Sequence, residues 1–153
     1  MPVAFMYNIG MYKLAKGELD LSSANLGVAL LNESSTAGSE PDVTKLADFS
    51  TLGEITAKNY ERKTLTSLSV TQDDGNNQVA FTAGNLVYEG LGGDGQDDEI
   101  TAELIYLKSN DDDDEENVPL FYMEIEPLHT NGSDVNLNVH ADGVMLLKNK
   151  ASS

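Results

Sequence analysis

The sequence predicts a mainly β fold: an antiparallel β-sandwich or barrel-like single domain over residues 1–153, with a short N-terminal helix. The chain has 153 residues, the usual length of one domain. Short apolar stretches recur about every 10–15 residues, which is typical of antiparallel sandwiches and barrels. Turn-forming sequences separate them, most clearly Asp73-Asp74-Gly75-Asn76-Asn77.

The N-terminal segment has the pattern of a short amphipathic helix, because its apolar residues recur at spacings of three and four. These residues are Phe5, Met6, Ile9, Met11, Tyr12, Leu14 and Ala15. Gly10 weakens the pattern, and Gly17 is suited to end the helix.

Eight later segments are expected to form strands. They are residues 27–31, 65–70, 78–82, 85–89, 100–106, 120–125, 135–139 and 144–147. The second and third flank the Asp-Gly and Asn-rich turn, which predicts a hairpin. In the fifth, Ile100, Ala102, Leu104 and Tyr106 alternate along the chain, as expected for a strand with one buried face.

The segments between these strands are predicted to be mainly loops. Residues 32–42 are rich in Ser, Gly, Pro and Asp, and residues 43–49 are expected to form one or two helical turns. Residues 90–99 form a Gly/Asp loop whose acidic part is residues 92–99. The six consecutive acids at residues 111–116 predict a solvated loop tip, because such a run cannot pack.

Charge restricts the partners that the chain can bind. It has 9 basic and 26 acidic residues and a formal net charge of −17. Residues 1–72 hold 6 basic and 8 acidic side chains, whereas residues 73–153 hold 3 and 18. Proteins bind nucleic acid and anionic lipid with Lys and Arg, so neither is an expected partner. The acids form either a well-solvated surface or a patch that faces a basic partner.

No catalytic constellation is recognisable, and we expect a protein without enzymatic activity or cofactor. The chain has no cysteine, which excludes disulfides, thiolate zinc sites and cysteine nucleophiles. Its two histidines, His129 and His140, lack a zinc-binding spacing. The start of the chain has neither the features of a secretory signal nor a long apolar run, so we expect it to be soluble as made.

Calcium is the metal that the sequence suggests most strongly. Residues 92–97 match the first six positions of the G-G-x-G-x-D-x-U-x repeat, which binds calcium when copies stack. Here Asp98 replaces the apolar residue of that motif, and there is only one copy. Asp94, Asp97 and Asp98 therefore remain candidates for weak calcium binding, and a hydrated acidic loop is the alternative interpretation.

Several segments resemble small virion proteins of tailed bacteriophages. In that family a short helix leads through a G-x-I/L-D-L step into an apolar first strand, as in residues 13–21 and 28–31 here. Similar pieces follow at residues 53–55, Tyr60, residues 62–66, 77–81, 87–88, 105–106, 119–120 and 143–144. The acidic run at residues 111–116 and the negative second half depart from the family pattern.

The resemblance implies a virion structural protein of the capsid decoration (cement) type, bound to the major capsid protein or other virion proteins on the outer shell. It also implies a symmetric homo-oligomer, with a trimer favoured, that is soluble in the host cytoplasm before assembly. Two alternatives stay open: a tail or head–tail joint protein, and a calcium-dependent binding domain.

The near-neutral N-terminal stripe is the candidate for the protein interface, because interface cores are poor in charge and rich in aromatic residues and Met. The interface candidates are Phe5, Met6, Tyr7, Ile9, Met11 and Tyr12. The alternative is that this stripe is an ordinary core helix.

Overall fold

A computed structural model describes residues 4–138 and 145–148 of the chain. In chain order its elements are β1 (Ala4–Met6), α1 (Asn8–Ala15), β2 (Leu26–Leu31), the 3-10 helices η1 (Ala37–Ser39) and η2 (Leu46–Asp48), β3 (Lys63–Thr64), β4 (Ser69–Asp73), β5 (Gln78–Thr82), β6 (Leu86–Tyr88), β7 (Glu99–Leu107), β8 (Val118–His129), β9 (Val135–Leu137) and β10 (Met145–Lys148). All strand pairs are antiparallel. The predicted mainly β class with a short N-terminal helix is confirmed.

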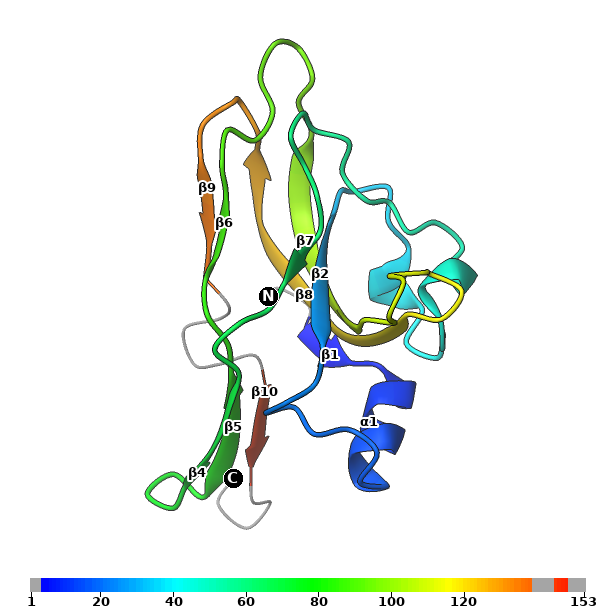
Figure 1. Cartoon of the computed structure of the whole chain (residues 1–153), viewed down its shortest axis with the longest axis vertical. Coiled ribbons are helices and arrows are strands. Elements are labelled where there is room, and N and C mark those ends of the chain that lie inside the picture. Colours follow the sequence, from blue (N-terminus) through cyan, green and yellow to red (C-terminus); the bar gives the residue numbers. More distant parts are fainter. Residues whose placement is uncertain (1–3, 139–144, 149–153) are drawn as a thin grey trace.

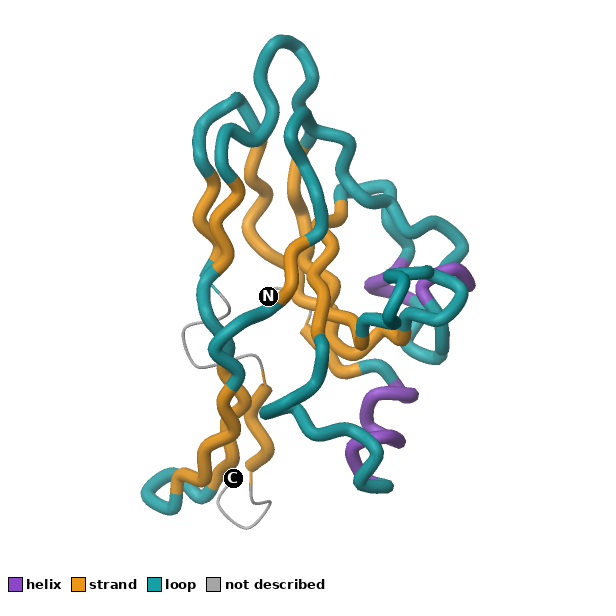
Figure 2. The backbone as a smooth tube through the Cα atoms, viewed as in Figure 1, coloured by secondary structure: helices purple, strands orange, loops and turns teal. Residues whose placement is uncertain are grey.

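The strands form three sheets. The main sheet has five strands in the order β1-β8-β7-β2-β3, and two smaller sheets have the orders β10-β5-β4 and β6-β9. In Figure 1 the β6-β9 pair lies beside the upper part of the main sheet. The β10-β5-β4 sheet lies at the lower end of the molecule. Helix α1 lies across from it at this lower end. The loops that carry η1 and η2 lie on the other side of the main sheet (Figure 2).

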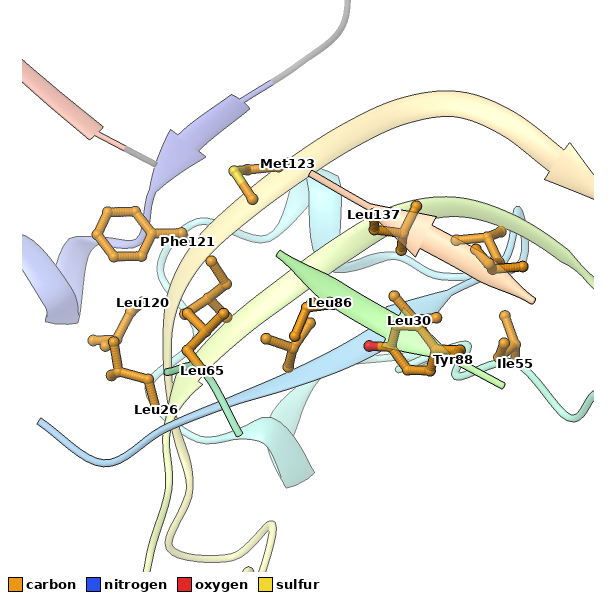
Figure 3. Packing of buried hydrophobic residues seen from close by; sticks show 14 of the residues in the cluster. Leu26, Leu30, Ile55, Leu65, Leu86, Tyr88, Leu120, Phe121, Met123 and Leu137 are labelled. Atoms are coloured by element: carbon orange, nitrogen blue, oxygen red, sulfur yellow. The ribbon is translucent and has the colours of Figure 1, made fainter. Parts of the chain in front are cut away.

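One hydrophobic core lies between the main sheet and the two smaller sheets, which gives the molecule its sandwich character. Leu30 and Phe121 come from the main sheet, whereas Phe81, Tyr88 and Leu137 come from β5, β6 and β9. Figure 3 shows several of these side chains pointing into the space between the strands. All of them are buried, and Leu137 is the most exposed at 8%. Burial of such large apolar side chains is the main favourable contribution to folding.

A second core covers the opposite face of the main sheet. Leu104 and Tyr106 of β7 pack there with Tyr7, Leu46 and Phe49, which come from the segments outside the sheet. Gly27 of β2 lies opposite Tyr106, and a Cβ atom at this position would collide with the Tyr106 ring. Glycine is therefore needed here, because the Tyr106 ring occupies the space that a side chain would fill.

Strand β7 differs from the predicted one-sided strand. A register shift between Ile100 and Ala102 turns Ile100 toward the first core, while Ala102, Leu104 and Tyr106 face the second core. Residues 102–106 are all buried, so both faces of the strand are covered. The simple alternation therefore predicted the strand but not its surroundings.

Two further expectations need correction. Residues 4–6 form β1 rather than the start of the helix, because they pair with β8, and the Tyr7 N–H donates to the Leu120 carbonyl at 2.9 Å. Leu65 and Leu68 precede β4, and Ser67 between them adopts a positive φ of 54° that interrupts a strand. Within residues 43–49, Leu46–Asp48 forms one helical turn, in agreement with the predicted one or two turns. His140 and the ends of the strands expected at residues 135–139 and 144–147 lie outside the described residues.

Candidate docking surface

The predicted interface residues divide between the core and the surface. Tyr7 has no exposed area, and its hydroxyl donates to the Ala37 carbonyl at 2.8 Å, so Tyr7 cannot contact a partner. Phe5 and Ile9 pack against the second core, and Met6 packs against the first. Met11 and Tyr12 on α1 are 49% and 55% exposed. Of the N-terminal stripe, these two residues are the ones that present a large free apolar surface.

An apolar groove of about 370 Å³ lies between α1 and the β10-β5-β4 sheet. Its lining consists of Leu14, Gly17, Leu19, Asp20, Leu21, Val70, Val79, Phe81 and Leu147. Leu19, Leu21 and Phe81 are buried, whereas Val70 and Leu147 are 46% and 50% exposed. The groove therefore has a buried apolar floor and partly exposed apolar walls. The groove could not be predicted from the sequence, because its walls are far apart along the chain.

The apolar wall is one face of the β10-β5-β4 sheet. Val70 of β4 pairs with Phe81 of β5, and Gln72 pairs with Val79, which in turn pairs with Leu147 of β10. Directly paired residues of an antiparallel sheet point to the same side. One face of this sheet is therefore apolar except for Gln72. The residues that alternate with these along the strands, such as Thr71 and Ala80, belong to the other face.

Charge distinguishes this end of the molecule from the rest. The segments around the groove, residues 4–24, 66–83 and 145–148, carry three basic and four acidic side chains, a net of −1. The full chain has a net charge of −17, so all other residues together carry −16. A surface with little charge and exposed apolar side chains has the composition of an interface core.

The acidic run at residues 111–116 is not the uniformly solvated tip that its composition predicts. Arg62 binds the Asp114 carboxylate with two hydrogen bonds of 2.8 and 3.0 Å, and binds Glu54 with another pair of the same lengths. Asp112 accepts hydrogen bonds from the Tyr106 hydroxyl at 2.9 Å and the Asn117 amide at 2.8 Å. Asp112 and Asp114 therefore fasten this loop to the domain, and the other four acids of the run are exposed.

The Arg62 site joins one guanidinium to the carboxylates of Glu54, Asp112 and Asp114. The guanidinium lies between Glu54 and Asp114 and stacks over the Tyr106 ring at 5.3 Å. Burial alone would lower the pKa of Arg62, but the hydrogen bonds to Asp114 and Glu54 outweigh burial and raise it. The hydrogen bonds from Arg62 to Asp114 also lower the pKa of Asp114. Such paired, partly buried charges hold neighbouring segments together.

The calcium candidates do not converge. Asp94 forms an ion pair with Lys58 at 2.5 Å, and Asp97 accepts a hydrogen bond from the Gly93 N–H at 2.6 Å. Asp98 accepts bonds from the Asn32 amide and the Thr56 N–H, both at 3.0 Å. Burial raises the pKa of Asp98, but these bonds outweigh it and lower the pKa. In the part of the chain that the structure describes, no three acidic or histidine side chains form a group that could hold a metal ion.

A buried acid, Glu103, was not singled out from the sequence. It lies on β7, is 2% exposed, and one of its carboxylate oxygens has no hydrogen-bond partner among the described residues. The hydroxyl of the buried Tyr88 is also without a partner there. Burial raises the pKa of Glu103 to about 7. An acid within a strongly apolar strand was the available signal, but the burial of its side chain could not be predicted from the sequence.

Comparisons with known proteins give no relative. No family model matches the chain, and no match was found among curated proteins or solved structures. Among the described residues, no helix has the length and apolar character needed to cross a membrane.

Proposed function

We propose that this chain is a non-enzymatic structural protein of a tailed-phage particle, and that it docks on the outer shell of the capsid as a decoration protein. The resemblance of its segments to small virion proteins suggests the particle. The observation that carries the docking proposal is the apolar groove between α1 and the β10-β5-β4 sheet, because it lies at the near-neutral end of a strongly acidic molecule.

Desolvation and charge repulsion both favour docking through the groove. Docking through the groove buries Val70 and Leu147, which are half exposed in the free chain, and requires few charges to lose water. The acidic remainder would face solvent, where its charge opposes non-specific association and contact with DNA. A tail or head–tail joint location is the alternative. Docking there would also bury the apolar groove and leave the acidic remainder in solvent.

Copy number distinguishes these locations. Quantitative mass spectrometry of purified particles should find the chain in hundreds of copies if it decorates the capsid. About a dozen copies would instead indicate a joint, because portal and tail rings are small cyclic assemblies. Absence of the chain from purified particles would contradict the proposed function as a whole.

A binding assay tests the role of the groove. Particles assembled without this chain are mixed with the purified protein and sedimented. Leu147→Asp places a charge on the groove wall and should abolish co-sedimentation. Val87→Asp is the matched control, because Val87 is also an exposed strand residue, at 46%, but lies outside the groove lining. Equal binding by both variants would show that another surface docks.

A further inference from the structure

Strand β4 is an unprotected sheet edge. It is the outer strand of the β10-β5-β4 sheet, and in the described chain its backbone pairs with β5 alone. Residues 69–72 are exposed and uncharged, and the register with β5 runs without a bulge. Natural proteins usually protect such an edge with Lys, Pro, a bulge or a covering segment. Among residues 4–138 and 145–148 this edge has none of these, and it includes the β-branched residues Val70 and Thr71, which favour strands.

We propose that β4 strands from two copies of the chain pair antiparallel across a two-fold axis at Thr71, which joins the two three-stranded sheets into one. A two-fold axis perpendicular to the sheet keeps every residue on its own face, so only residues of the same face can lie opposite each other. The register that pairs all of Ser69–Asp73 then places Thr71 opposite Thr71, Val70 opposite Gln72 and Ser69 opposite Asp73.

Charge and side-chain chemistry favour a second copy as the occupant of this edge. Asp73 is the one charged residue of β4, and the register places it opposite Ser69, whose hydroxyl can donate to a carboxylate. No like charges face each other, and Thr–Thr pairs are favourable across strands. The surrounding segments carry a net charge of only −1, so two copies meet here with little of the repulsion that the remaining −16 would cause.

The pairing has a consequence for docking. Because the apolar face of each sheet stays on its own side, the faces that contain Val70 and Leu147 in the two copies become neighbours. Two docking grooves on one rigid body would bind a repeating lattice with increased avidity. The contact is isologous and closes as a dimer, unlike the trimer that the resemblance favoured. The pairing is independent of what the groove binds.

Light scattering of the purified full chain tests the pairing. The expected mass in the concentrated wild-type protein is twice the chain mass of 16.5 kDa. Thr71→Lys places two ammonium groups opposite each other and should give monomers, as should Thr71→Glu with its two carboxylates. An equimolar mixture of the two variants should restore the dimer. Val87→Lys, an exposed change on β6, should leave the dimer intact. Monomers of wild type up to millimolar concentration, or a dimer that the Thr71 changes leave unaltered, would overturn the proposal.

Single-cysteine variants test the register, because the chain has no cysteine of its own. Opposed residues of an antiparallel pair have Cα atoms about 4.5–5.5 Å apart, within the range of a disulfide. Thr71→Cys should therefore form a cross-linked dimer under mild oxidation. The two copies of Gln72 would be about 8 Å apart, so Gln72→Cys should not cross-link. Cross-linking at residue 72 that is as fast as at residue 71 would contradict the register.

Discussion

The central strands of the main sheet, β2 and β7, are covered on both faces, whereas the β10-β5-β4 sheet leaves part of its apolar face open. All six residues of β2 are buried, and residues 102–106 of β7 are buried as well. In the smaller sheet, Val70 and Leu147 remain about half exposed although their strands also contain apolar residues. Local apolar content therefore does not separate a core strand from a strand with an open face. The layers around each sheet make that distinction.

The two regions also differ in their use of charge. Beside the main sheet, Arg62 joins Glu54 to Asp114, so paired charges hold loops against the domain. Around the groove, the ion pairs are exposed ones on α1 and its following turn, such as Lys16 with Glu18 at 3.5 Å. Exposed pairs of this kind contribute little to stability. The first region is therefore built for stability, and the second is available for contact.

The largest expected effect comes from the same substitution made in both regions. Leu104→Ala removes a fully buried side chain from the second core and should lower the free energy of unfolding by roughly 2–5 kcal/mol. Leu147→Ala on the open face should change it by less than about 1 kcal/mol, because half of this side chain is already in water. Urea denaturation measures the unfolding free energy of both variants. Equal losses would mean that the smaller sheet is as completely packed as the main sheet.

The buried acid in the main sheet should limit stability at neutral and basic pH. The pKa of Glu103 is raised by burial from 4.5 to about 7, so the folded state resists its ionisation. The unfolding free energy should therefore fall as the pH rises from about 4.5 to 7 and stay lowered above that, by roughly 3 kcal/mol. Glu103→Met removes this loss. The free energy of unfolding of the variant, relative to that of wild type, should therefore be higher at pH 8 than at pH 4.5. A stability difference that is independent of pH would show that Glu103 ionises freely.

The acidic run at residues 111–116 should divide into structural and dispensable acids. Asp114→Asn weakens the pair with Arg62 and should cost roughly 1–2 kcal/mol of unfolding free energy at pH 7. Glu115→Gln, an exposed neighbour, should change it by less than about 0.5 kcal/mol. The pKa of Asp114 is lowered, so its contribution is present above the ordinary carboxyl pKa and is lost as the pH falls through the folded value. Equal effects of the two changes would restore the solvated-loop interpretation.

The sequence predicted what depends on local patterns. The Asp-Gly and Asn-rich turn identified the β4–β5 hairpin, and the strand expected at residues 78–82 coincides with β5. It could not predict β1, because residues 4–6 fit the spacing of the helix that follows and pair with distant β8. The role of Asp114 was equally hidden. Its partner Arg62 is 52 positions away, and nothing in the run distinguishes it from its neighbours.

Hydrogen exchange on the particle tests whether the chain docks through the open face of the β10-β5-β4 sheet. The exchange rates of backbone amides are compared between the free chain and the chain bound to its particle. Docking through the open face should slow exchange in residues 8–21 and 69–82, which carry most of the groove, and leave residues 92–99 and 111–116 unchanged. Slowed exchange confined to these two acidic loops, with unchanged exchange in the groove, would contradict docking through the groove.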